Sequence, residues 1–158
     1  MGAARALEEQ HQDPSNKRIV LIGAGGAARA IAFTLARRAR SVLILNRTEH
    51  RALKLAKDIE QRVGKKILVR SLAGNSLLEA LQGADILINA TSVGMYPRTG
   101  QTVATRKALH SGMVVFDIVY NPVKTLLLRE AEAAGAKAIT GVGTVSYTHL
   151  TLPTNREV

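Results

Sequence analysis

Two glycines and an alanine stand at the spacing Gly23-x-Gly25-x-x-Ala28, directly after the apolar run Ile19–Ile22. This is the spacing of the turn that binds the diphosphate of a dinucleotide between a strand and a helix. The first glycine permits the tight turn, the second lets the backbone approach the diphosphate, and the small third residue keeps helix and strand in contact. The first amides of the helix then face the anion, which the helix dipole also favours. The pattern predicts a dinucleotide-binding turn, and a purely structural turn is the alternative.

Polar and basic residues follow the second apolar run, Ser41–Leu45, at about 20 residues past the glycines, where dinucleotide folds choose between cofactors. A NAD-binding protein usually has Asp or Glu there, which holds the ribose hydroxyls and would repel a 2′-phosphate. This chain has Asn46, Arg47 and Thr48, and Arg51 follows one helical turn later. Two guanidinium groups and a hydroxyl suit a phosphate, because arginine can donate two charge-assisted hydrogen bonds. The pattern favours NADP over NAD. The alternative is a helix cap at Thr48 among surface arginines.

The elements that must position these residues are apolar runs of strand length, which alternate with segments of helical periodicity. The expected strands are 19–22, 41–45, 66–70, 84–88, 113–116 and 137–140. Strands that alternate with helices are typical of an α/β fold, here a Rossmann-type doubly wound parallel sheet of about six strands with flanking helices. Such folds bind ligands at the carboxyl edge of the sheet. Asn89 and the polar residues after it are expected at that edge.

Three further signals concern the helices. The helix after the glycine turn is expected to bury Ala27, Ile31 and Leu35, which recur at steps of four. The pattern Ser76-x-x-Glu79 indicates a capping box that opens a short helix. Pro122 suits the start of the helix after the fifth strand.

The composition limits the class of protein. A chain of 158 residues with 46% hydrophobic residues fits one globular domain. There is no cysteine, which excludes disulfides and thiolate metal sites, and the four histidines are scattered, so no metal site is expected. The formal charge of +10 raises the question of nucleic acid, but with 3% aromatic residues and scattered cations we expect no such partner. Without a bilayer-length apolar run or a secretory signal, we expect a cytoplasmic protein and no membrane partner.

Four motifs occur in order along the chain: GAGGAARA at 23–30, NRT at 46–48, NATSVGM at 89–95 and DIVYNPVKTLLL at 117–128. Together they resemble the shikimate dehydrogenase family, which includes shikimate/quinate dehydrogenases, over nearly the whole chain to Gly143. The resemblance implies the C-terminal NADP-binding domain of an oxidoreductase. That enzyme reduces 3-dehydroshikimate to shikimate with NADPH in chorismate and aromatic amino-acid biosynthesis, so the implied partner is a small-molecule substrate.

The motifs of the family assign roles to positions of this chain. The implied cofactor-binding residues are Gly23, Ala24, Gly25, Gly26, Ala27, Asn46, Arg47, Thr48, Arg51, Thr91, Ser92, Ile118 and Gly141. Residues 23–27 are implied to bind the diphosphate, residues 46–51 the adenosine 2′-phosphate, and the last four the nicotinamide side. Tyr120 is implied to reach the substrate. Apart from the family, Tyr120 is equally compatible with an exposed loop aromatic and Asn89 with a cap at the end of a strand.

The chain departs from the family pattern in two places. The family has a substrate domain before the cofactor domain, and a lysine and an aspartate of that domain form the proton-transfer pair. We expect residues 1–143 to be the NADP-binding domain, with a helix over 1–13, and no catalytic residue or substrate domain in this chain. The family has methionine, leucine and a helix after Gly143, whereas residues 144–158 lack a helical period and resemble translated vector sequence. We therefore expect a non-native tail, and a chain that binds NADP without turning over substrate.

Four other functions remain open on the sequence alone. One is a quinate/shikimate dehydrogenase paralogue, and another is a different NADP oxidoreductase with the same domain, such as a distantly similar glutamyl-tRNA reductase. The third is a non-catalytic NADP-sensing module. The fourth is a basic nucleic-acid binder, whose affinity would fall steeply with salt.

Overall fold

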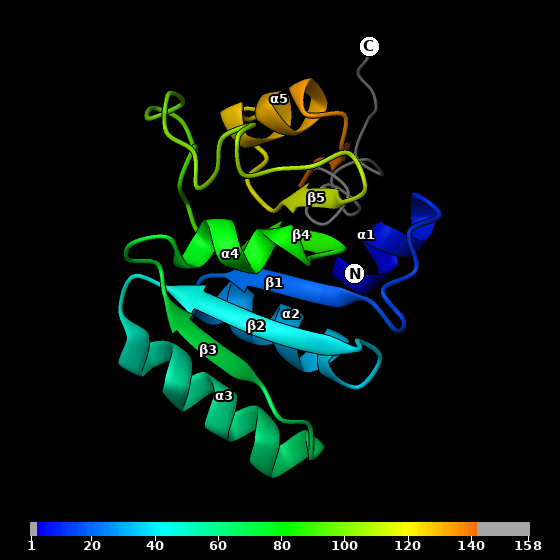
Figure 1. The fold of residues 1–158 in the computed structure, drawn as a ribbon, viewed down its shortest axis with the longest axis vertical. Helices are drawn as coiled ribbons and strands as arrows, with labels where there is room; N and C mark the ends of the chain where they lie inside the picture. The colour runs from blue at the N-terminus through cyan, green and yellow to red at the C-terminus, as the bar shows by residue number, and fades with distance from the viewer. Residues whose placement is uncertain (1–2, 142–158) are drawn as a thin grey trace, which may run out of the picture.

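Six parallel strands form one sheet in the computed structural model, which describes residues 3–141 (Figure 1). They are β1 Arg18–Ile22, β2 Ser41–Asn46, β3 Leu68–Ser71, β4 Ile86–Asn89, β5 Val114–Asp117 and β6 Lys137–Ile139. Their order is β3-β2-β1-β4-β5-β6, and every neighbouring pair runs parallel. This order confirms the predicted Rossmann-type doubly wound sheet. The predicted domain end at 143 and the tail 144–158 lie outside the described residues.

Helices cover both faces of the sheet. They are α1 Ala3–Glu9, α2 Gly26–Ala36, α3 Glu49–Val63, α4 Ser76–Gln82 and α5 Leu126–Ala133. In β1, Ile19 and Leu21 pack with α1, α2 and α3, whereas Val20 and Ile22 pack with α4, α5 and the segment 104–113. Burial on both faces explains why the strands are continuous apolar runs. Within residues 3–141 no helix is long and apolar enough to cross a membrane.

The two central strands, β1 and β4, mark the point where the winding of the sheet reverses. β1 pairs with β2 on one side and with β4 on the other (Figure 1). The connection after β1 leads to β2, and the connection after β4 leads the opposite way to β5, so the two connections diverge above the sheet. Open α/β folds bind their ligands in the crevice that this divergence leaves at the carboxyl edge.

The start of α5 differs from the prediction. The helix begins at Leu126 and not at Pro122. Thr125 is its N-cap, and the Thr125 hydroxyl accepts the Leu128 N–H at 3.2 Å. The helix starts after Thr125 because the threonine hydroxyl accepts a hydrogen bond from an amide of the first turn.

The start of α4 is at Ser76, as the sequence indicates, but the predicted capping box does not form. Asn75 is the N-cap, and no side chain caps this end of the helix. Instead, Glu79 Oε1 lies 3.8 Å from Nη1 of Arg70 in β3. Both partners are exposed, so this ion pair contributes little to stability.

Gly141, just after β6, provides a test of how β5 and β6 pack at the carboxyl edge. A Cβ atom at Gly141 would overlap the carbonyl of Ile118. We expect Gly141→Ala to lower the free energy of unfolding by about 1–3 kcal/mol, as overpacking in a tight core does. Gly83→Ala is the matched control, because a Cβ there would meet nothing within 4 Å. Urea unfolding measures both, and equal stabilities of the two variants would contradict the close packing.

Candidate functional site

The turn between β1 and α2 is anchored at Gly23. Its φ of +122° is a conformation that favours glycine. The Gly23 N–H donates to the Leu45 carbonyl at 2.9 Å, which ties the turn to β2. On the other side, a Cβ would lie 3.0 Å from the Ala90 oxygen and 3.2 Å from Thr91 Cγ2. Conformation and space both require glycine here, so the turn is fixed between the ends of β2 and β4.

The open part of the turn is formed by Gly25 and Gly26. A Cβ on either glycine would meet nothing within 4 Å, so free space lies in front of α2. Gly25 is the N-cap and has no side chain to satisfy the first amides. The Arg29 N–H donates to the Gly25 carbonyl at 2.9 Å, and the amides before it need partners from outside the helix. An anion in this space would accept those amides at the positive end of the helix dipole.

The alanines of the turn divide between the core and the crevice. The prediction that Ala27 faces the core is wrong, because Ala27 is exposed. The inner stripe of α2 includes Ala28, Ile31 and Leu35, and Ala24 is half-buried against the same core. Ala28 thus keeps helix and strand in contact, as the spacing predicts, while Ala27 leaves the space in front of α2 open.

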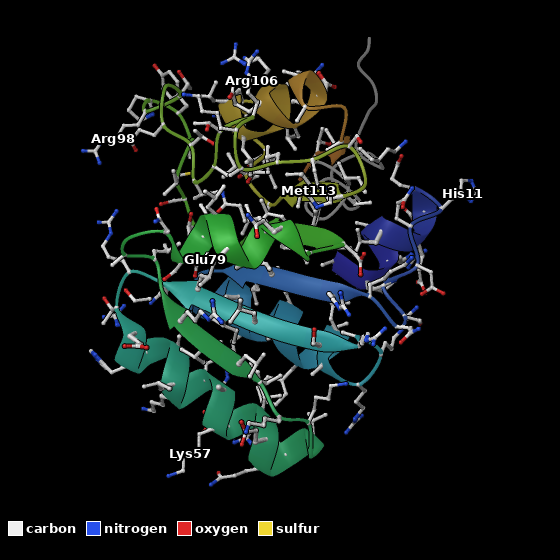
Figure 2. The ribbon with its side chains drawn as sticks, in the orientation of Figure 1. His11, Lys57, Glu79, Arg98, Arg106 and Met113 are labelled. Atoms are coloured by element: carbon white, nitrogen blue, oxygen red, sulfur yellow. The ribbon has the colours of Figure 1, made fainter. Side chains whose placement is uncertain are left out.

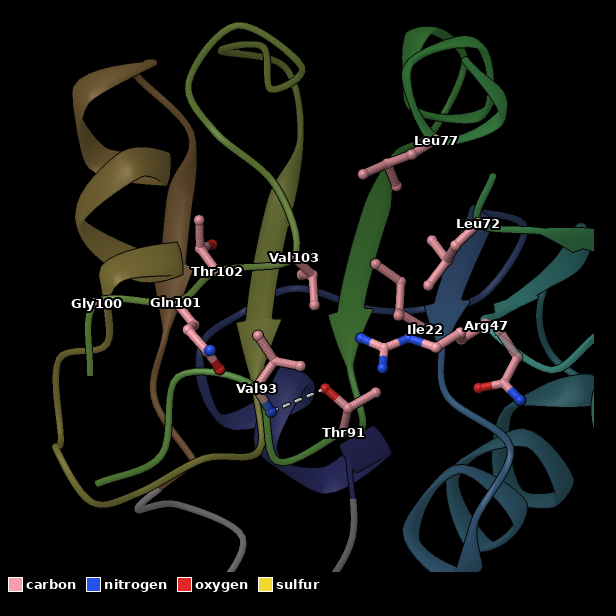
Figure 3. A pocket seen from close by; sticks show the side chains of 11 residues that line it. Ile22, Arg47, Leu72, Leu77, Thr91, Val93, Gly100, Gln101, Thr102 and Val103 are labelled. Carbon is pink, nitrogen blue, oxygen red and sulfur yellow. Dashed lines mark hydrogen bonds between the residues drawn. The ribbon is translucent and has the colours of Figure 1, made fainter. Parts of the chain in front are cut away.

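A pocket of about 820 Å³ lies at the carboxyl ends of β1, β2 and β4, and we call it the inner pocket (Figure 3). Its lining is Ile22, Asn46, Arg47, Leu72, Leu77, Thr91, Val93, Gly100, Gln101, Thr102 and Val103. Figure 3 shows the Arg47 side chain extending across the end of β1 beside Ile22, with Thr91 just past the end of β4. Apolar side chains, hydroxyls and one guanidinium thus meet in a space of the size that binds small molecules.

A second pocket of about 500 Å³ continues from the first, and we call it the outer pocket. Its lining is Arg47, Ser92, Val93, Met95, Tyr96, Pro97, Arg98 and Gln101. The two pockets share Arg47, Val93 and Gln101. Neither lining contains Asp, Glu, His or Lys. No cluster of three or more His, Cys, Asp or Glu that could hold a metal ion occurs in residues 3–141.

The segment after β2 brings Arg47 to both pockets. Asn46 Nδ2 donates to the Thr48 carbonyl at 2.9 Å, which shapes the turn and leaves Asn46 Oδ1 for another donor. Thr48 is the N-cap of α3, but its side chain makes no capping hydrogen bond. Arg51 is exposed in the first turn of α3 and lines neither pocket. Across residues 3–141 no carboxylate pairs with Arg47 or Arg51.

Three fully buried polar side chains, Asn89, Asp117 and Thr125, join the loops at this edge. Asp117 Oδ1 accepts from Asn89 Nδ2 and from the Val119 N–H, both at 3.0 Å, and Oδ2 accepts from the Thr125 hydroxyl at 2.7 Å. Asn89 Oδ1 accepts the Thr91 N–H at 3.1 Å and the Thr91 hydroxyl at 2.7 Å. Asn89 therefore caps the end of β4, and Asp117 fixes this cap relative to β5 and α5.

Burial raises the pKa of the Asp117 carboxyl above its ordinary value of 3.8, although hydrogen bonds from Thr125, Val119 and Asn89 oppose the shift. The carboxylate is thus held at the edge by its donors and not by an opposite charge. A buried group of this kind stabilises a geometry as long as every donor keeps its acceptor.

The remaining predicted residues differ in their relation to the pockets. Ser92 lines the outer pocket, and Ile118 is half-buried against the core next to Gly141. Tyr120 is 51% exposed and lines neither pocket. The Tyr96 N–H donates to the Asn121 carbonyl at 2.8 Å, which joins the loop after β4 to the loop after β5. The roles implied for Ile118, Gly141 and Tyr120 stay predictions.

Sequence reasoning missed the side chains that close the pockets. Leu72 and Leu77 come from the β3–α4 segment, and Gln101, Thr102 and Val103 from the loop after β4. No motif marks them, because they come together only when the chain folds. The available signal is the run Pro97–Gly100, which contains turn-forming residues and predicts a loop that folds back.

Residues 5–125 match the family model described as Shikimate / quinate 5-dehydrogenase. A relative of Methanosarcina acetivorans with the name shikimate dehydrogenase (NADP(+)) is 49% identical over 148 residues, which are 93% of this chain and 52% of that protein. The chain spans about half the length of the curated relatives that it matches.

Two solved structures share the fold over a similar stretch. A shikimate dehydrogenase in complex with NADP+ has a TM-score of 0.85 and 41% identity, over 95% of this chain and 52% of that chain. The shikimate 5-dehydrogenase of Listeria monocytogenes, in complex with shikimate and NAD, has a TM-score of 0.83 and 31% identity, over 93% of this chain and 53% of that chain.

The buried contacts of Asp117 lead to a prediction for Asp117→Asn. Asparagine keeps one acceptor oxygen for Asn89 and Val119, but its NH₂ group faces the Thr125 hydroxyl, whose proton loses its acceptor. We expect a loss of about 1–3 kcal/mol of unfolding free energy at pH 7, the usual cost of an unsatisfied buried group. Asp58→Asn is the control, because Asp58 pairs with Arg29 in a partly exposed ion pair, and its loss should stay below about 1 kcal/mol.

The stability difference between wild type and Asp117→Asn should depend on pH. Because the folded-state pKa of Asp117 is raised, the protonated carboxyl favours the folded state. The stabilisation that comes from this proton is fully present when the pH is below 3.8, the ordinary pKa of the group. It is lost as the pH rises through the raised pKa of the folded state. Urea unfolding of both proteins from pH 3.5 upward should show their difference shrinking. A difference that grows with pH over this range would contradict the assignment.

Proposed function

The chain belongs to the shikimate / quinate 5-dehydrogenase family, and on that premise we propose that it is the cofactor-binding part of an NADP-dependent shikimate dehydrogenase. Such an enzyme reduces 3-dehydroshikimate to shikimate with NADPH. The observation that carries the proposal is the juxtaposition of the open glycine turn with Arg47. A glycine turn with free space in front of α2 and an arginine that has no carboxylate partner within residues 3–141 both lie at the carboxyl edge of one sheet.

The residues present fit a phosphorylated dinucleotide. The space in front of Gly25 and Gly26 suits the diphosphate, since a Cβ would project into it and amides point toward it. The inner pocket suits the adenosine, because it combines apolar walls with the polar side chain of Asn46. Asn46 stands where a NAD-binding protein usually has an acidic residue, so the lining holds no charge that would repel a 2′-phosphate.

The 2′-phosphate is assigned to Arg47 and Arg51, and the nicotinamide side to Thr91, Ser92, Ile118 and Gly141. When bound, NADPH supplies the hydride. The residues of this chain bind and orient the cofactor, and the Asp117 contacts hold the loop after β4 in the position that this orientation requires. Positioning of this kind is a large part of catalysis when two reactants must meet in one geometry.

The proton for the reduced oxygen is assigned to a group outside residues 3–141. Hydride transfer to a ketone needs an acid that protonates the developing alkoxide. Neither pocket lining provides a lysine, histidine or carboxyl group, and all three donors of Asp117 are protein groups. Tyr120 is the residue that we assign to substrate contact, from its exposed place after β5. Quinate is the alternative substrate, since the family model includes quinate dehydrogenases.

Calorimetric titration with NADP and NAD tests the cofactor. We expect NADP to bind more tightly than NAD. Arg47→Ala should weaken NADP binding by about 1.5–3 kcal/mol, the value of a charge-assisted contact, and leave NAD binding nearly unchanged. Arg62→Ala removes another exposed charge, at the opposite end of α3, and should leave both affinities unchanged. Equal losses for NADP and NAD in Arg47→Ala would show that Arg47 does not contact the 2′-phosphate.

An assay of shikimate oxidation tests whether this chain binds the cofactor but lacks the group that transfers the proton. The purified 158-residue chain should bind NADP but show no appreciable NADP reduction with shikimate, because the pocket linings hold no lysine, histidine or carboxyl group to accept the hydroxyl proton. Absorbance at the NADPH maximum measures the rate, and a full-length relative serves as the positive control. Appreciable turnover by the chain alone would show that the proton-transfer group lies within this chain. A bound NADP that changes association with a partner protein would favour the sensing module instead.

A further inference from the structure

Arg98 is a second arginine at the crevice, and it comes from a different loop than Arg47. Arg47 follows β2, Arg98 belongs to the loop after β4, and both line the outer pocket. Figure 2 shows Arg98 at the outside of its loop, on the side of the molecule where the strands have their arrowheads. The two arginines therefore flank one space at the carboxyl edge of the sheet.

The loop that presents Arg98 is folded on itself. The Met95 N–H donates to the Ser92 carbonyl at 3.0 Å, and the Arg98 N–H donates to the Met95 carbonyl at 2.9 Å. A Cβ at Gly94 would lie 3.1 Å from the Gln101 carbonyl, so the two ends of the loop are in close contact. The position of the Arg98 backbone is thus fixed by the loop, and only its side chain has to adapt to a ligand.

The chemistry of the outer pocket favours an anion. Its lining includes the two arginines Arg47 and Arg98 and the amide residue Gln101, and it has no carboxylate residue. Within residues 3–141 neither Arg47 nor Arg98 forms an ion pair. Two like charges at one pocket repel each other, in a chain with a formal charge of +10. An anion between the two arginines would attract both of them and so offset this repulsion.

We propose that Arg98 is a further specificity-determining residue, which binds the 2′-phosphate of NADP from a different loop than Arg47 and Arg51. The inference rests on the proposed function, which places adenosine in the inner pocket. The amides of α2 would hold the diphosphate, whereas a dinucleotide fold contacts the 2′ position with residues at the end of the second strand, here Arg47. The outer pocket shares Arg47 with the inner pocket, so a 2′-phosphate bound by Arg47 would lie at a pocket that Arg98 also lines.

Calorimetry on Arg98→Ala, Arg98→Lys and the control Arg62→Ala, with NADP and NAD as ligands, tests the inference. Arg98→Ala should weaken NADP binding about tenfold and change NAD binding less than twofold, as loss of one charge-assisted contact does. Arg98→Lys should recover part of the loss, because it keeps the charge but not the planar fork. Arg62→Ala should match wild type. Thermal unfolding of Arg98→Ala should also match wild type, because the substitution leaves the backbone contacts of the loop in place.

The outcomes separate this inference from the proposed function. If wild type binds NADP and Arg47→Ala weakens that binding while Arg98→Ala does not, the inference is wrong and the proposed function stands. Equal weakening of NADP and NAD by Arg98→Ala also overturns the inference, because the contact is then not with the 2′-phosphate. If wild type fails to bind NADP, both are wrong.

Discussion

The buried carboxylate of Asp117 is the contact on which the carboxyl edge of the sheet depends. It joins the cap of β4, the end of β5 and the first turn of α5 through three hydrogen bonds. No opposite charge compensates it, so its burial is tolerated only while all donors stay in place. The starts of the loops after β4 and β5, which bring side chains to the crevice, are joined through this group.

The electrostatics of the crevice follow from the same arrangement. The cap of Asn89 fixes Thr91 and begins the loop that carries Arg98, while Arg47 arrives from β2. The two pockets thus contain Arg47 and Arg98 and no carboxylate residue, and the open N-terminus of α2 lies at the same edge of the sheet. A ligand with negative charge at two separated places is the complement of this surface, as a phosphorylated dinucleotide is.

The sequence was sufficient for the fold and for the backbone of the site, because both depend on local signals. Apolar runs predict the six strands, and Gly23 is required by a positive φ that the motif already indicates. Ala27 was assigned to the wrong face because periodicity alone does not set the rotation of a helix. Asp117 and Thr125 could not be recognised as a network, since their contact joins elements that meet only in the folded chain.

A crystal structure of the chain with NADP tests the central claim most directly. We expect the diphosphate against the amides before Arg29, the adenosine in the inner pocket and the 2′-phosphate within hydrogen-bond distance of Arg47. A nucleotide bound elsewhere, or in this crevice with its 2′-phosphate turned away from every arginine, would contradict it.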